Sequence, residues 1–467
     1  MIPLTVAEVA EAVDGRIFGI DPGVVISDVV VDSRAVPSGA MFVAIAGERV
    51  DGHAYAELAV SDGAGVVLSA RDLHNAEGGA LPCIVVADPV TALGRLAHHV
   101  LVAHLTCRVA ALTGSSGKTS TKDLLGAILS AHGPTVSPQG SFNTEVGVPL
   151  TILRADADTE FLVVEMGMRG RGHISYLVDI CEPDVGLVLN VGSAHVGMLG
   201  SRQAIAEAKG ELPAGLRPTA IAVLNADDPL VSAMAASTTA AVLTFGESAG
   251  ADIRAEHVRL DPVARASFTV IDTRDGSAAP VSLQVSGEHY VSNALGACSV
   301  ALALGLPLDE IASALSSAKP ESRWRMEVID APGGFTVIND AYNANPESMR
   351  AALKALVALG NGRRTWAVLG EMRELGDEAL TEHDAIGRLA VRLDISRLVC
   401  VGEGTRVMHL AASNEGSWAD ESSYVATVDE AIDLVCREVR PGDVVLVKAS
   451  RSIGLERVAQ ALIGGTT

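Results

Sequence analysis

The order of apolar and amphipathic segments along the chain predicts alternating strands and helices. From Arg108 onward the chain contains four continuous apolar runs, RVAALTG, FLVVEMG, VGLVLNVG and AIAVLNAD, separated by segments with helical spacing. Strands that are buried on both faces of a parallel sheet have this continuous pattern. The segment from Asp252 to Ser286 alternates instead, which predicts antiparallel strands attached to the same sheet, before a helix near Ser292.

Related patterns lie on both sides of this region. Residues 24–105 mix short apolar runs with turn residues and close on the helical segment TALGRLAHHVLVAHL. After Glu321, strands and helices alternate again in FTVIND, TWAVLGEM, RLVCVGEG and DVVLVKAS, which is typical of a doubly wound unit. We therefore expect an α/β protein of three domains, a small N-terminal one (1–105), a central parallel-sheet one (106–319) and a C-terminal Rossmann-like one (320–467).

Composition narrows the class of protein. A chain of 467 residues with 48% apolar content can bury several cores, and its net charge of −22 disfavours nucleic acid as a partner. The N-terminus lacks a basic start before an apolar run, and no stretch reaches the roughly 18 apolar residues of a membrane span. We expect a cytoplasmic monomer whose six cysteines are reduced core residues, since they have no metal-binding spacing: Cys83, Cys107, Cys181, Cys298, Cys400 and Cys436.

The run TGSSGKTS, between the strand RVAALT and the helical segment TKDLLGAILSAHGP, predicts a phosphate loop that binds ATP. Gly114 and Gly117 allow backbone N–H groups to approach phosphates, Lys118 reaches the terminal phosphates, and Thr119 offers its hydroxyl to Mg²⁺. The general motif has a glycine where this chain has Leu112, so the loop is a shorter variant, and an ordinary glycine turn is the alternative. The predicted loop comprises Gly114, Ser115, Ser116, Gly117, Lys118, Thr119 and Ser120.

Further motifs follow this loop in order: SFNTEVGVPLTIL, VVEMGMRGRGHI, NVGSAHVGMLGS, AEAKGELP, NADDP, NDAYNANPESM and VLVKASRS. Together they resemble the Mur ligase family of peptidoglycan synthesis across nearly the whole chain. EMGMRGRGHI, DAYNANPESM and GEMRELG are most similar to the member that adds a dipeptide, and the DNPR motif of the diaminopimelate-adding relative is missing. The resemblance implies a uridine-nucleotide domain, a central ATPase and a Rossmann-like domain for the incoming amine.

The resemblance also implies a reaction. The carboxylate of UDP-N-acetylmuramoyl-tripeptide would attack the γ-phosphate of ATP, and the amine of D-alanyl-D-alanine would displace phosphate from the acyl phosphate. Two Mg²⁺ ions are expected to accompany ATP. Such a reaction depends mainly on positioning and on charge neutralisation.

Four residues form the predicted catalytic set. Lys118 belongs to the loop, and Glu165 ends the strand FLVVE at the ligand-binding edge, where it suits Mg²⁺ beside Thr119, although a helix-capping carboxylate is the alternative. The resemblance makes His195 a ligand of the second ion, whereas a lone loop histidine is otherwise simply hydrogen-bonded. Lys209 would be a solvated helix lysine on sequence alone. The resemblance implies that it carries a carbamate, which ligates the second metal or the acyl phosphate.

The resemblance assigns further residues to substrates. For ATP it implies Asn293 on the adenine side, Arg325 or its neighbour Arg323 at the phosphates, Asp340 at the ribose and Asn343 against the base. Without it, Asn293 is a helix-terminal polar residue and Arg325 a surface cation. The remaining assignments are Ser33, Arg34 and His53 for the nucleotide sugar, Asn143 and Thr144 for the muramoyl peptide, and Lys448 and Arg451 for the dipeptide carboxylate. The first three could equally be turn residues.

Two other functions share the central motifs. One is ligation of another amino acid to a nucleotide peptide, or of glutamate to folate, although the folate enzyme should lack a uridine-type first domain. The other is a nucleotide-gated binding module, which would hydrolyse ATP slowly whatever peptide is present. Glu165, His195 and Lys209 together disfavour the module, because binding alone does not need two metal positions.

Overall fold

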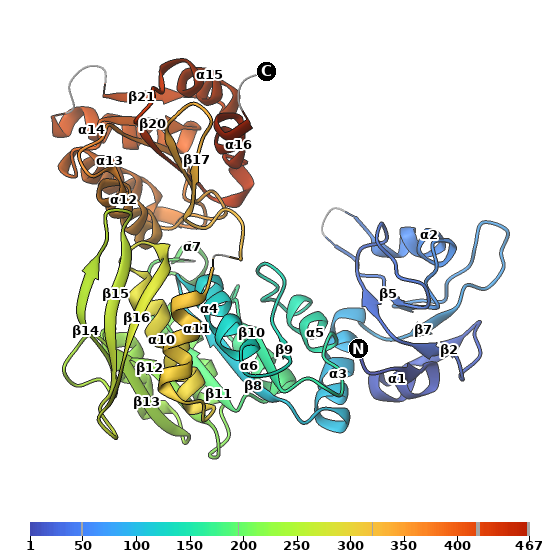
Figure 1. Cartoon of the computed structure of the whole chain (residues 1–467). Helices are drawn as coiled ribbons and strands as arrows, with labels where there is room; N and C mark the ends of the chain where they lie inside the picture. The colour runs from blue at the N-terminus through green and yellow to red at the C-terminus, as the bar shows by residue number, and fades with distance from the viewer. Residues whose placement is uncertain (48–49, 195, 320, 417–420, 465–467) are drawn as a thin grey trace.

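The computed structural model describes residues 1–47, 50–194, 196–319, 321–416 and 421–464. Three domains follow one another along the chain, as the blue, green and orange-red parts of Figure 1 show. The α/β class predicted from the apolar runs is confirmed, since each domain contains a largely parallel sheet with helices against it.

The N-terminal domain is built on a five-stranded sheet of order β2-β7-β6-β5-β4, in which β4 to β7 are parallel and β2 is an antiparallel edge. Its strands are β2 (Arg16–Phe18), β4 (Val29–Val30), β5 (Met41–Val43), β6 (Val66–Ser69) and β7 (Cys83–Val85), with β1 (Leu4–Thr5) and β3 (Val25–Ile26) forming a separate pair. Its helices are α1 (Val6–Val13), the short η1 (Gly52–Tyr55), α2 (Ala56–Ser61) and α3 (Pro89–His104).

Helix α3 joins this domain to the rest of the molecule. It begins where Asp88 accepts a hydrogen bond from the Thr91 N–H at 2.8 Å, with Pro89 in the first turn, which is a favourable start for a helix. Its apolar face packs against α1 on one side and against α5 (Gly147–Ile152) and α6 (His173–Cys181) of the central domain on the other. The N-terminal domain therefore stands beside the central domain on α3 (Figure 1).

The central domain contains a nine-stranded sheet of order β16-β15-β14-β13-β12-β11-β8-β10-β9 within the described residues. The strands are parallel from β9 to β14, and β14, β15 and β16 are antiparallel, as the alternating segment predicted. The strands are β8 (Arg108–Thr113), β9 (Thr135–Val136), β10 (Phe161–Glu165), β11 (Val185–Val188), β12 (Ile221–Asn225), β13 (Ala241–Gly246), β14 (Ile253–Leu260), β15 (Arg265–Asp272) and β16 (Ser277–Ser286). Besides α5 and α6, its helices are α4 (Lys118–Ser130), α7 (Val196–Leu199), α8 (Arg202–Ala214), α9 (Pro229–Ser232), η2 (Ala233–Ser237), α10 (Tyr290–Ala303) and α11 (Leu308–Ser317).

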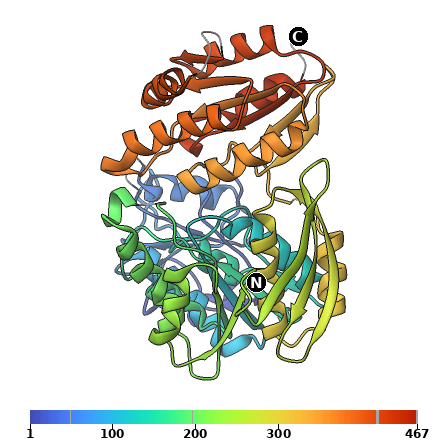
Figure 2. The same cartoon turned by 90° about the vertical axis from the view of Figure 1, so that its left-hand side faces the viewer.

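The C-terminal domain has a sheet of order β17-β18-β22-β19-β20-β21, parallel except for the edge strand β17. The strands are β17 (Glu327–Asp330), β18 (Thr336–Asn339), β19 (Thr365–Gly370), β20 (Arg397–Val401), β21 (Ser422–Val425) and β22 (Val444–Lys448). The helices are α12 (Pro346–Gly360), η3 (Gly376–Glu378), α13 (Ala379–Arg392), η4 (Glu403–Thr405), α14 (Arg406–Glu415), α15 (Val428–Glu438), η5 (Arg451–Ile453) and α16 (Glu456–Gly464). Figure 2 shows this domain stacked on the central one.

Two expectations from composition can be compared with the structure. All six cysteines are free, but only four are buried, because Cys107 and Cys436 lie partly at the surface; the prediction of six core residues was wrong for these two. Among the described helices, none is both long and apolar enough to cross a bilayer.

Candidate active site

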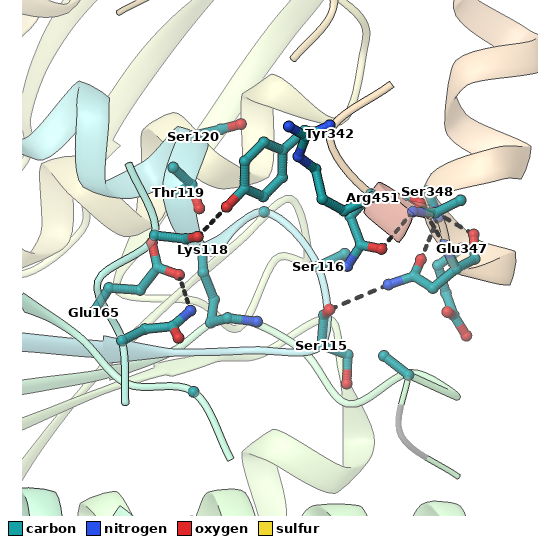
Figure 3. A pocket seen from close by; sticks show the side chains of 18 of the residues that line it. Ser115, Ser116, Lys118, Thr119, Ser120, Glu165, Tyr342, Glu347, Ser348 and Arg451 are labelled. Atoms are coloured by element: carbon teal, nitrogen blue, oxygen red, sulfur yellow. Dashed lines mark hydrogen bonds between the residues drawn. The ribbon is translucent and has the colours of Figure 1, made fainter. Parts of the chain in front are cut away.

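A cavity of about 1000 Å³ lies between the central and C-terminal domains (Figure 3). It is lined by the phosphate loop, the ends of β10 and β22, the first turn of α10 and the segment leading into α12. Most of the residues singled out in the sequence meet here: Ser115, Ser116, Gly117, Lys118, Thr119, Ser120, Asn143, Thr144, Glu165, Asn293, Arg325, Asp340, Asn343, Lys448 and Arg451.

The phosphate loop has the local structure that its sequence predicts. Strand β8 ends at Thr113, and α4 begins at Lys118 directly after Gly117, which has a φ of +80°. A Cβ atom at Gly117 would lie 2.3 Å from Oδ1 of Asn293, so both the backbone conformation and the crowding require glycine. The loop therefore opens into a helix N-terminus, where free N–H groups favour an anion.

Asn190, which the sequence analysis missed, supports this loop. Its Oδ1 accepts hydrogen bonds from the N–H groups of Ser115 at 3.0 Å and Ser116 at 2.9 Å, and its Nδ2 donates to the Ser116 carbonyl at 3.1 Å. Asn190 follows β11, the strand paired with β8, so both lie at the carboxyl edge of the sheet. That edge is where open α/β sheets bind ligands, and the rule could have identified Asn190.

Lys118 is half-buried at the end of the loop. Its Nζ donates to the Gly114 carbonyl at 2.7 Å. Burial lowers the pKa of Lys118, the nearby Glu165 carboxylate raises it in part, and the Arg325 guanidinium lowers it. A desolvated ammonium of this kind interacts strongly with phosphate oxygens, because the surrounding dielectric is low.

Glu165 ends β10 and is 1% exposed. Its Oε1 accepts a hydrogen bond from Nδ2 of Asn143 at 2.7 Å, while its buried Oε2 has no hydrogen-bond partner among the residues that the structure describes. Thr119, 2% exposed, lies across from it in the first turn of α4 (Figure 3). A buried, unpaired carboxylate oxygen near a hydroxyl fits a hard cation such as Mg²⁺, which prefers oxygen ligands.

Lys209 lies inside α8 and is 1% exposed, so the solvated lysine expected from sequence alone was wrong. Burial, and then the positive charge of Lys118, hold the pKa of Lys209 well below its usual value. The side chain is therefore biased toward the uncharged amine. His195, the other predicted metal ligand, lies outside the described residues.

Arg325 and Asn293 face the cavity from two domains. The Arg325 guanidinium stacks on the Tyr342 ring at 4.2 Å, and its buried Nε has no hydrogen-bond partner in the described part of the chain. Nδ2 of Asn293, a residue 4% exposed, is likewise unpaired among the described residues. Arg323 is exposed and is absent from the lining, so Arg325 is the one of the two that lies in the cavity.

Lys448 is held by its own domain. Its Nζ lies 2.6 Å from Oδ2 of Asp340 and donates to the Asn343 carbonyl at 2.9 Å. Arg451, the second cation predicted for the dipeptide, stacks on the Trp324 ring at 4.4 Å and pairs with Glu456 at 2.7 Å. Arg451 has a half-exposed side chain, whereas Lys448 is 2% exposed and neutralises Asp340.

The three candidates of the N-terminal domain do not line the cavity. The Arg34 guanidinium donates to both carboxylate oxygens of Asp32, at 2.9 and 2.7 Å, and Arg34 lowers the pKa of Asp32 to about 2. His53 is buried, with Nδ1 2.5 Å from Asp51 and Nε2 accepting the Ala70 N–H at 3.1 Å. Ser33 is half-buried in the same segment as Arg34.

Comparison with known proteins gives one consistent relationship. Three family models match in order: "Mur ligase family, catalytic domain" at residues 25–100, "Mur ligase middle domain" at 112–301 and "Mur ligase, glutamate ligase domain" at 324–451. The chain is 46% identical to the UDP-N-acetylmuramoyl-tripeptide–D-alanyl-D-alanine ligase of Mycobacterium tuberculosis, covering 100% of this chain and 99% of that one. It is 33% identical to the ligase of the same name from Escherichia coli, covering 99% of each.

Solved structures agree with this relationship. A crystal structure of MurF from Acinetobacter baumannii superposes with a TM-score of 0.88 at 32% identity, covering 99% of each chain. MurF from Thermotoga maritima, solved in complex with ADP, gives a TM-score of 0.79 at 28% identity, covering 94% of this chain and 97% of that one. The chain belongs to the Mur ligase family.

Proposed function

We propose that the protein joins D-alanyl-D-alanine to UDP-N-acetylmuramoyl-tripeptide at the expense of ATP, giving the pentapeptide, ADP and phosphate. The observation that carries this proposal is the cavity itself, in which a phosphate loop, an unpaired buried carboxylate oxygen and cations from two domains converge. The full-length similarity to relatives that bear the name of this ligase supports the choice of substrates. Because these substrates are nucleotide-linked and the donor is ATP, the proposed location is the cytoplasm.

In the proposed complex, ATP lies on the phosphate loop. Loop N–H groups and Lys118 hold the phosphates, and Arg325 approaches them from the C-terminal domain. The unpaired Nδ2 of Asn293 offers a donor to the adenine side, and Asp340 and Asn343 line the same cavity for the ribose and the base. The neighbour from Thermotoga maritima, which was solved with ADP, supports a nucleotide at this site.

Thr119 and Glu165 would hold one Mg²⁺ beside the terminal phosphates, because their oxygens are buried and one carboxylate oxygen is unpaired within the described residues. When bound, this ion would neutralise charge on the phosphate that is transferred. His195 and Lys209 remain the predicted holders of a second ion. A carbamate on Lys209 is proposed as well, since only an uncharged amine adds to carbon dioxide and this amine is biased toward that form.

The chemistry of the protein is then one of holding reactants in place. Asn143, oriented by Glu165, and Thr144 are proposed to hold the tripeptide with its carboxylate near the γ-phosphate. A carboxylate oxygen attacks the γ-phosphorus, the bond to the β-phosphate oxygen breaks and ADP leaves. The dipeptide amine, positioned by Arg451, attacks the acyl carbon, and phosphate leaves with that carboxylate oxygen as the amine loses a proton. Exclusion of water protects the acyl phosphate from hydrolysis.

The experiment is a reconstitution with pure protein, ATP, Mg²⁺, UDP-N-acetylmuramoyl-tripeptide and D-alanyl-D-alanine, from which each component is omitted in turn. Phosphate release and product mass are followed together. Phosphate should appear only when both peptides are present, and the acceptor mass should rise by one dipeptide residue. Phosphate release that ignores the peptides would exclude the ligase and favour a nucleotide-gated module.

A further inference from the structure

The C-terminal domain touches the phosphate loop directly, through the start of α12. Asn345 lies at the N-cap of α12, where Oδ1 accepts the Ser348 N–H at 2.8 Å. The other side-chain atom of Asn345, Nδ2, crosses the domain boundary and donates to the Ser115 carbonyl at 3.2 Å. One side chain therefore caps the helix and binds the loop at once.

Glu347, in the first turn of the same helix, makes a second contact across the boundary. Its Oε1 accepts hydrogen bonds from the Ser193 N–H at 2.9 Å and from Oγ of Ser193 at 3.0 Å, and Ser193 is 5% exposed. The carboxylate occupies space that Gly192 leaves free, since a Cβ there would lie 2.6 Å from Cδ of Glu347. A charged acceptor in the first turn is also favoured by the helix dipole.

The two contacts converge on Ser115. The N–H of Gly192, next to the serine that Glu347 holds, donates to Oγ of Ser115 at 2.8 Å. Asn345 reaches the carbonyl of the same residue. Ser115 is thus held at two acceptor atoms, its carbonyl by α12 and its Oγ by the segment that Glu347 contacts.

We propose that Asn345 and Glu347 are positioning residues that set the C-terminal domain in register with the phosphate loop. This inference rests on the proposed function, in which the dipeptide is held by the C-terminal domain and the acyl phosphate by the central one. Both residues line the cavity, but the proposed reaction assigns neither to a reacting atom, and each would act through Ser115 or Ser193. A misplacement of about 1 Å can slow a positioned reaction by about 10²-fold. A loosened boundary should therefore slow amine attack by more than it weakens ATP binding, to which the C-terminal domain contributes only part of the lining.

The test uses variants of the full chain in which each cross-boundary contact is altered separately. Asn345→Asp keeps the helix cap but replaces the donor to Ser115 with an oxygen, and Glu347→Ala removes the contact with Ser193. Glu347→Gln keeps one oxygen for the Ser193 N–H and serves as the conservative rescue. Glu382→Ala is the matched control, because this carboxylate pairs with Arg350 inside the C-terminal domain.

Three quantities are measured: the dipeptide-dependent kcat, the dissociation constant of ATP, and the acyl phosphate trapped by borohydride without dipeptide. Asn345→Asp and Glu347→Ala should lower kcat by about tenfold or more, whereas ATP affinity and the amount of trapped intermediate should fall by a clearly smaller factor, about threefold at most. Glu347→Gln should recover most of the lost rate, and Glu382→Ala should lower the melting temperature alone.

Two results would overturn the inference. In the first, Asn345→Asp and Glu347→Ala keep the wild-type kcat, while their melting temperatures fall as in Glu382→Ala. The contacts would then contribute only to stability. The second is an equal loss of ATP affinity, which would place the residues in the nucleotide site. A wild-type protein that makes no pentapeptide would instead contradict the proposed function, so the two failures are distinguishable.

Discussion

The cavity between the central and C-terminal domains and the surface of the N-terminal domain hold their candidate residues in opposite ways. In the cavity, Oε2 of Glu165, Nδ2 of Asn293 and Nε of Arg325 are buried without hydrogen-bond partners among the described residues. In the N-terminal domain, Arg34 is paired with Asp32 and His53 is satisfied by Asp51 and Ala70.

This difference separates a site that needs its ligand from one that does not. A buried polar group without a partner is costly, so several in one cavity are typical of a place completed by a bound molecule. Groups whose hydrogen bonds and ion pairs are already made within the chain do not need a ligand to complete them. The structure therefore supports a ligand site more strongly in the cavity than in the N-terminal domain. The experiments below test this difference.

The largest effect is expected for Lys118. Lys118→Met should lower kcat by about 10³-fold, because the desolvated charge that faces the phosphates is lost. Lys122→Met is the matched control. Lys122 lies one turn further along α4, is more buried than Lys118, and donates to the Pro138 carbonyl outside the cavity. The Lys122→Met control should be less stable than the wild type, but its folded molecules should have the wild-type kcat. Equal loss of kcat in both variants would contradict the special role of Lys118.

Glu165→Gln is expected to separate activity from stability. The amide keeps an oxygen for Nδ2 of Asn143. The change removes the cost of a buried carboxylate, whose Oε2 has no hydrogen-bond partner among the described residues, but also its attraction to Lys118, so the melting temperature should stay about the same. Activity should fall by about 10²-fold, with a weaker dependence on Mg²⁺ concentration. Thermal unfolding and a Mg²⁺ titration of the rate measure the two properties. A clear drop in melting temperature would mean that Glu165 is a structural carboxylate.

Lys209 gives a prediction about pH. The pKa of Lys209 is depressed in the folded protein. Below the usual pKa of 10.5, the unfolded chain therefore binds a proton at Lys209 that the folded chain does not bind. The contribution of Lys209 to the free energy of unfolding consequently falls as the pH falls. Lys209→Met removes the effect. In urea unfolding without carbon dioxide, the variant's gain in stability over the wild type should be larger at pH 6.5 than at pH 9. A gain independent of pH would show that the lysine is not desolvated.

Arg34→Ala should give the smallest effect. The Arg34 side chain is 85% exposed and its pair with Asp32 lies at the surface, so the free energy of unfolding should stay nearly unchanged. If Arg34 contacts the nucleotide sugar, KM for the UDP-linked substrate should rise severalfold at constant kcat. An unchanged KM would show that Arg34 does not contact the substrate. The difference between the cavity and the N-terminal domain would then be larger.

The parts of the fold that the sequence predicted are those set by local patterns. Continuous apolar runs identified the buried parallel strands, and the glycines around Lys118 identified the loop between β8 and α4. The helix cap at Asn345 was not predicted, and the bond from Asn345 to Ser115 spans 230 residues and depends on how two domains dock. No local pattern reports such a contact.

Burial of polar residues was the least predictable property. Lys209 lies in a helix with an ordinary polar composition, and only the packing of α8 against β11 and α6 shows that it is desolvated. Asn190 was missed for a related reason, since its partners Ser115 and Ser116 lie 75 and 74 residues earlier in the chain. Both misses involve side chains whose environment is created by distant segments.

The central claim, that a substrate carboxylate is activated as an acyl phosphate in this cavity, is tested most directly by an oxygen label. UDP-N-acetylmuramoyl-tripeptide with ¹⁸O in its terminal carboxylate is turned over with ATP and D-alanyl-D-alanine, and the released phosphate is examined by mass spectrometry. The account predicts one ¹⁸O atom in each phosphate, because the attacking carboxylate oxygen leaves with phosphorus. Unlabelled phosphate accompanied by pentapeptide would contradict it.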